Sequence, residues 1–132
     1  MTTPKKILVA DDDLDMVYLL KEIFQKHGFE VVTAHDGYEA LKVLKTNTPD
    51  LMVVDLTMPS MNGWQFTMKV RRDERFKATP IIVLSGLLEG DCEPEKFDSV
   101  SAYVVKPFDV FKLIDKMKEL LKLAQNSSYE KG

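Results

Sequence analysis

The sequence predicts an α/β fold, a doubly wound parallel sheet of five strands with about five helices. Short apolar runs rich in Val and Ile occupy residues 6–10, 51–55, 81–85 and 102–106, with a weaker run at 30–34. Their polarity is continuous rather than alternating, which is typical of strands buried on both faces. Helical patterns separate the runs. This alternation predicts a parallel sheet with right-handed crossovers and helices on both faces.

The predicted helices follow the strands in order. Leu14 to His27 has apolar residues at helical spacing, and Gly28 is a stop signal. Further helices are expected over 36–46, 63–72 and 109–125. The stretch 93–100 is the poorest candidate because it is short and has Pro94 near its start. We therefore expect the fourth helix, between Gly86 and Ala102, to be short or irregular.

The composition limits the number of domains and the kind of protein that the chain can form. The chain has 132 residues, 45% of them apolar and 30% charged, which suits one compact domain. We assign residues 1–125 to that domain and 126–132 to a polar C-terminal tail. A net charge of −3 gives no basic excess, so direct DNA binding is not expected. The sequence shows neither a membrane-length apolar run nor a signal-peptide pattern, so a cytoplasmic location is expected.

Polar residues stand at the carboxyl ends of the predicted strands, where ligands bind in such sheets. They are Asp11 to Asp13, Asp55, Ser85 and Lys106. Oxygen ligands without His or Cys suit Mg²⁺ or Mn²⁺, and the metal would supply the countercharge that the acidic cluster lacks. A metal beside a lysine and a hydroxyl is typical of phosphoryl transfer.

Four motifs resemble the receiver domain of two-component response regulators. They are "ILVADDDLD" (7–15), "VVDLTMPSMNGW" (53–64), "IIVLSG" (81–86) and "AYVVKPF" (102–108), and their order and spacing match from about Lys5 to Leu123. The resemblance implies the flavodoxin-like strand order 2-1-3-4-5. It also implies a phosphoacceptor that assists its own phosphorylation and dephosphorylation rather than an enzyme.

The resemblance implies roles for the strand-end residues. Asp55 would be the nucleophile that accepts phosphate from a histidine kinase or a histidine phosphotransfer protein. Asp11, Asp12 and Asp55 would bind Mg²⁺ (or Mn²⁺) together with the backbone carbonyl of Thr57. Lys106 would pair with Asp55 and then with the phosphoryl group, and a cis Lys106–Pro107 bond is expected.

The same resemblance implies a switch. Ser85 would donate to the phosphoryl group, and Tyr103 would swing inward, although a half-buried aromatic without a switching role is the alternative. The fourth helix, fifth strand and fifth helix would then present a changed face to a downstream protein. The exposed face of the first helix, including Val17, Tyr18 and Lys21, is either a docking surface for the phosphodonor or a plain solvated face.

The chain departs from the family pattern before the last strand. Ser99 and Val100 stand where a Gly-Ala pair is usual. Leu87 cannot orient an attacking water, so slow self-dephosphorylation is expected. A monomer or weak dimer is expected, and the starting Met and the polar tail favour a stand-alone regulator.

Three alternatives compete with this reading. A phosphatase of the haloacid dehalogenase type would have D-x-D-x-T after the first strand, but Asp15 stands in the Thr position. A flavin-binding carrier would need a hydroxyl- and glycine-rich phosphate loop where "DDDLD" stands. A third possibility, a receiver-like interaction module that is never phosphorylated, remains an open alternative.

The other two aspartates of the acidic cluster have a structural explanation. Asp13 is expected to be the N-cap of the first helix, and Asp15 lies in its first turn.

Overall fold

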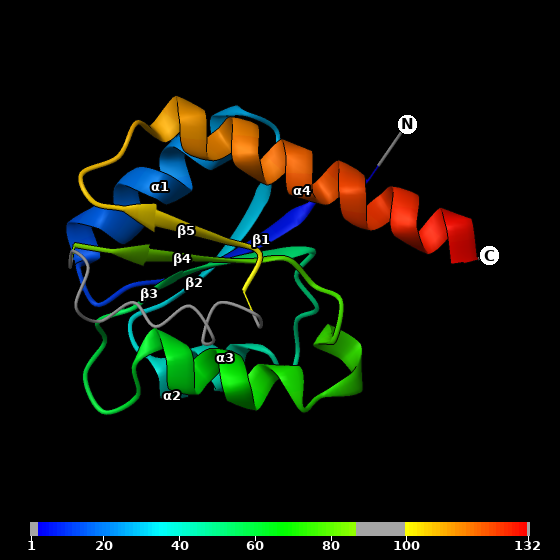
Figure 1. Cartoon of the computed structure of the whole chain (residues 1–132). Coiled ribbons are helices and arrows are strands. Elements are labelled where there is room, and N and C mark those ends of the chain that lie inside the picture. Colours follow the sequence, from blue (N-terminus) through cyan, green and yellow to red (C-terminus); the bar gives the residue numbers. More distant parts are fainter. Residues whose placement is uncertain (1–2, 87–99, 132) are drawn as a thin grey trace.

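The computed structural model describes residues 3–86 and 100–131, with side chains up to residue 124. Within these residues the strands form one parallel sheet of order β2-β1-β3-β4-β5, which confirms the predicted fold class and order (Figure 1). The strands are β1 (Lys6–Ala10), β2 (Glu30–Ala34), β3 (Leu51–Asp55), β4 (Ile81–Ser85) and β5 (Ala102–Val105). The helices are α1 (Leu14–Lys26), α2 (Gly37–Val43), α3 (Gly63–Arg71), the 3-10 helix η1 (Glu74–Phe76) and α4 (Val110–Lys131). The short or irregular helix predicted between Gly86 and Ala102 falls on residues 87–99, outside the described part.

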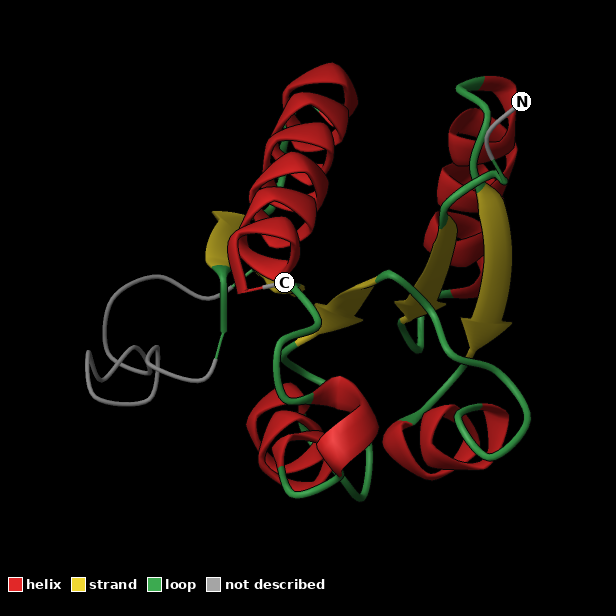
Figure 2. Cartoon of the chain, turned by 90° about the vertical axis from the view of Figure 1, so that its right-hand side faces the viewer, coloured by secondary structure: helices red, strands yellow, loops and turns green. Residues whose placement is uncertain are grey.

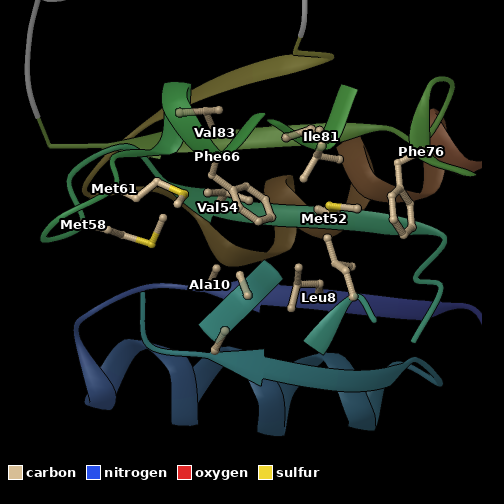
Figure 3. Close-up of a cluster of buried hydrophobic side chains, with 14 of the residues drawn as sticks. Leu8, Ala10, Met52, Val54, Met58, Met61, Phe66, Phe76, Ile81 and Val83 are labelled. Atoms are coloured by element: carbon tan, nitrogen blue, oxygen red, sulfur yellow. The ribbon is translucent and has the colours of Figure 1, made fainter. Parts of the chain in front are cut away.

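Helices cover both faces of the sheet (Figure 2). Successive side chains of a strand point to opposite faces, so each strand contributes to two separate cores. The α2/α3 core includes Leu8, Ala10, Met52, Val54, Met58, Met61, Phe66, Phe76, Ile81 and Val83 (Figure 3). The α1/α4 core includes Ile7, Val9, Val17, Leu20, Phe24, Val53, Leu84, Leu113, Ile114 and Met117.

Helix α1 begins as predicted but presents a different face. One carboxylate oxygen of Asp13 accepts from the backbone N–H groups of Asp15 and Met16, at 3.1 and 3.2 Å, so Asp13 is the N-cap. The prediction that Val17 is exposed is wrong, since it is buried with Leu20 and Phe24 at the spacing of one helical face. Tyr18 is exposed, as predicted.

Helix α4 is longer than predicted. Its backbone stays helical to Lys131 through the residues assigned to a polar tail. The reason is local, because no Gly or Pro interrupts the chain between Val110 and Gly132. Across the described residues, no helix is both long and apolar enough to span a membrane.

Candidate metal centre

The register of the parallel strands brings the predicted residues to one edge of the sheet. Ala10 lies opposite Val54, Asp55 opposite Leu84, and Ser85 opposite Val105. The backbone N–H of Lys106 donates to the carbonyl of Ser85 at 2.7 Å. The residues that follow β1 and β5 therefore meet the last residues of β3 and β4.

Three carboxylates converge at this edge. Asp11, Asp12 and Asp55 each offer one oxygen, and these oxygens all lie within 4.8 Å of one another. Asp11 and Asp55 are buried while Asp12 is exposed, so the cluster opens toward solvent on one side. Hard oxygen donors in this number fit a divalent cation of the Mg²⁺ type, which takes a few carboxylates and keeps several waters.

The two buried carboxylates are oriented by backbone donors. The N–H of Asp13 donates to Asp11 Oδ1 at 2.9 Å, and the N–H of Thr57 donates to Asp55 Oδ1 at 3.2 Å. Both contacts span two residues and form turns directly after a strand. Thr57 thus touches the site through its N–H, and the role of its carbonyl as a metal ligand stays a prediction.

Among the described residues, Lys106 faces the cluster with its ammonium group. Its Nζ lies 3.1 Å from Asp11 Oδ2 and 3.5 Å from Asp55 Oδ2. The predicted partner was Asp55, and the structure adds Asp11 as the nearer one. The predicted cis Lys106–Pro107 bond is confirmed.

The charges perturb one another. Burial raises the pKa of Asp55 to about 7, and the neighbouring charge of Asp11 adds to this, while Lys106 opposes it. Burial alone would lower the pKa of the Lys106 ammonium, but its hydrogen bond to Asp11 and the two carboxylate charges outweigh burial and raise it. Without a metal, the three carboxylates therefore carry more negative charge than Lys106 balances.

The β3–α3 loop, residues 56–62, is folded tightly beside the cluster. The N–H of Gly63 donates to the carbonyl of Leu56 at 2.8 Å and closes the base of the loop. Ser60 has a φ of 68°, a left-handed conformation that is unusual for a residue with a side chain. Asn62 and Gln65 form a capping box that starts α3. The sequence motif marks this loop but carries no signal for these internal contacts.

The predicted switch residues lie near the same edge. The side chain of Ser85 is fully buried, and Tyr103 is half-buried against the α2/α3 core. These positions suit the predicted switch and the plain packing role alike, so switching stays a prediction. Leu87, to which slow dephosphorylation was attributed, lies outside the described residues. Trp64, at the start of α3, is partly buried and packs against the α2/α3 core.

An apolar groove borders the site. It has a volume of about 240 Å³ and is lined by Met16, Leu19, Leu20, Pro107, Phe108 and Val110. One side comes from the first half of α1, which follows the acidic residues, and the other from the residues that follow Lys106. Leu19 is half exposed, so the groove is open to a partner.

The fold and the site define a class, the doubly wound α/β proteins with a cluster of carboxylates that could hold a metal and a lysine at the carboxyl edge of the sheet. A family model places the chain more narrowly. It belongs to the response regulator receiver domain family, whose model matches residues 7–118.

Similar proteins span several kinds of regulator. The alkaline phosphatase synthesis transcriptional regulatory protein PhoP of Bacillus subtilis is 33% identical over 92% of this chain, which spans only 50% of PhoP. The polar-differentiation response regulator DivK of Brucella anthropi is 26% identical, over 89% of this chain and 97% of DivK. The response regulator TrrA of Thermotoga maritima, solved in complex with Mg²⁺ and BeF, is 34% identical with a TM-score of 0.79, over 88% of this chain and 98% of TrrA.

Proposed function

We propose that this chain is a phosphoacceptor in two-component signalling and that Asp55 receives the phosphoryl group. One observation carries the proposal: the Asp55 carboxylate is buried at the carboxyl edge of the sheet, with Lys106 Nζ 3.5 Å away and two further carboxylates beside it. A structural carboxylate would not need two acidic neighbours, because their repulsion costs stability.

The proposed transfer makes use of these contacts. The P–N bond of a phosphohistidine breaks, a P–O bond to an Asp55 carboxylate oxygen forms, and the electron pair of the P–N bond stays on the imidazole nitrogen. Thr57 holds the carboxylate through its N–H, and Lys106 moves with the negative charge as it passes to the phosphoryl oxygens. Asp11, Asp12 and Asp55 would hold Mg²⁺, which neutralises charge on the phosphoryl group when bound.

The reaction modifies the domain once, so the chain acts as a switch and not as a turnover enzyme. The donor would be a histidine kinase or a histidine phosphotransfer protein, and the signalling would take place in the cytoplasm. The groove beside Pro107 fits an apolar helix of that donor, because it lies next to Lys106 and the start of α1. A downstream protein would read the face that includes β5, where Ser85 and Tyr103 respond to the new charge.

Intact mass after incubation with acetyl phosphate and Mg²⁺ tests the proposal. Wild type should gain the mass of one phosphoryl group, and Asp55→Asn should gain none. Asp109→Asn is the matched control, because Asp109 is an exposed carboxylate whose side chain accepts from Phe111 and Lys112, and it should behave as wild type. No gain on wild type would leave the unphosphorylated interaction module as the better account, and an equal gain on Asp55→Asn would place the acceptor elsewhere.

A further inference from the structure

We propose that Gly37, the first residue of α2, is a positioning residue for the metal centre and acts through Met61 of the β3–α3 loop. This inference rests on the proposed function, since it names what holds the ligand loop of that same site. Gly37 lies outside the four sequence motifs, and the atoms nearest to a Cβ added there all belong to Met61. Its influence would pass through one side chain.

The contact between Gly37 and Met61 leaves no room for another atom. A Cβ at Gly37 would lie 2.8 Å from Met61 Sδ and 2.9 Å from Met61 Cβ and Cγ. Ordinary contacts between carbon atoms are about 3.5–4.0 Å. Met61 is 2% exposed and packs in the α2/α3 core, so it has no free space into which to retreat (Figure 3). The Cβ of Met61 belongs to the backbone frame, so the loop itself would have to move.

The loop transmits such a movement because its base is fixed. Gly63 donates to Leu56 at one end, and a Cβ at Gly63 would lie 2.8 Å from the carbonyl oxygen of Asp55, so α3 is seated directly on β3. Met61 donates to the carbonyl of Pro59 at 2.7 Å in a tight turn. A shift of Met61 is therefore absorbed between Leu56 and Pro59, the stretch that holds Thr57.

Thr57 is the end of this path. Its N–H donates to Asp55 Oδ1, and its carbonyl is the predicted fourth protein ligand of the metal. Residues that orient metal ligands without binding the metal affect affinity by about 10–100-fold when they are changed. A glycine that only filled a packing position would affect stability and leave affinity alone, so the two roles are separable.

The first experiment measures Mg²⁺ affinity by isothermal titration calorimetry, together with unfolding midpoints. Gly37→Ala should bind Mg²⁺ about tenfold more weakly than wild type. Gly28→Ala is the control, because Gly28 has a φ of 90° and nothing within 4 Å of an added Cβ, and it follows α1 at the other end of the sheet. It should lose stability and keep wild-type affinity.

The second experiment removes the contact from the other side. In a Met61→Gly background, Gly37→Ala should no longer change Mg²⁺ affinity, because the clashing atoms are gone. Met61→Ala, which adds no atom, should weaken binding on its own even if Gly37→Ala fails to fold. Met117→Ala, an equally buried methionine of the α1/α4 core, is its control and should keep the affinity.

The outcomes separate the inference from the proposed function. If Gly37→Ala binds Mg²⁺ as tightly as wild type, the positioning role is overturned and the metal centre stays intact. If Gly37→Ala does not fold, wild-type affinity in Met61→Ala has the same meaning. An equal loss with and without the Met61 side chain overturns the path through Met61. Failure of wild type to bind Mg²⁺ overturns the metal centre, and the inference with it.

Discussion

Replacing Asp55 by asparagine should stabilise the metal-free protein at pH 8. The carboxylate is buried beside Asp11, and both effects raise its pKa to about 7. A carboxyl group with a raised pKa binds its proton more tightly in the folded protein than in the unfolded chain. The free energy of unfolding of wild type therefore falls as pH rises from about 4 to about 7, and it stays low above that range. The amide carries no charge to bury, so the variant lacks this loss.

The size of the gain follows from the pKa. The rise from 3.8 to about 7, at about 1.4 kcal/mol per pH unit, sets a ceiling of about 4 kcal/mol. Water reaches the cluster on the side of the exposed Asp12 and screens part of this electrostatic cost. We therefore expect Asp55→Asn to raise the free energy of unfolding by about 2 kcal/mol at pH 8. For a domain of this size that corresponds to an increase in Tm of about 6–10 °C.

Urea unfolding in the presence of EDTA, at pH 5 and pH 8, measures the effect. At pH 5 the carboxyl is protonated in the folded protein and mostly ionised in the unfolded chain, so only part of the loss has set in and the gain should be clearly smaller than at pH 8. Asp36→Asn is the control, since Asp36 caps α2 by accepting from Glu39 and asparagine caps equally well. The reasoning is refuted if Asp55→Asn gains nothing at pH 8, or if it gains the same amount at both pH values.

Three further predictions follow from the same geometry. The affinity of wild type for Mg²⁺ should rise about tenfold between pH 6 and pH 8, because the proton on Asp55 competes with the metal, and a flat calorimetric profile would contradict this. Lys106→Met should raise the pKa of Asp55 further, because Lys106 now lowers it, and carboxyl NMR titration showing a lower or equal pKa would rule this out. Ser60→Gly should stabilise the protein by about 0.5 kcal/mol, because glycine adopts a left-handed φ without strain, and urea unfolding that shows a loss would count against it.

Much of the fold was predictable because its signals are local. Continuous apolar runs marked all five strands, and helical spacing marked α1, α2, α3 and the start of α4 within a few residues. Strand ends then placed Asp11, Asp55, Ser85 and Lys106 at one edge, because parallel strands share a direction. The N-cap role of Asp13 was equally local, since a capping residue and the backbone N–H groups that donate to it are sequence neighbours.

The errors and omissions depend on contacts between distant parts of the chain. Burial of Val17 depends on which side of α1 meets the sheet, and the apolar pattern of α1 is wide enough to allow more than one side. The nearer pairing of Lys106 with Asp11 is a tertiary detail that no spacing encodes. Gly37 of α2 and Met61 of the β3–α3 loop are in contact although they lie far apart in the sequence. Neither residue type alone predicts such a close approach.

The two sides of the metal centre are anchored in different layers of the molecule. Met58 and Met61, in the β3–α3 loop beside the carboxylates, belong to the α2/α3 core, whereas Val104 and Phe108, on either side of Lys106, pack against the α1/α4 core. The spacing between the lysine and the acids thus reflects the packing of both layers. A substitution that shifts the packing of one layer would therefore change the spacing between the lysine and the acids, and a compensating substitution in the other layer would restore it.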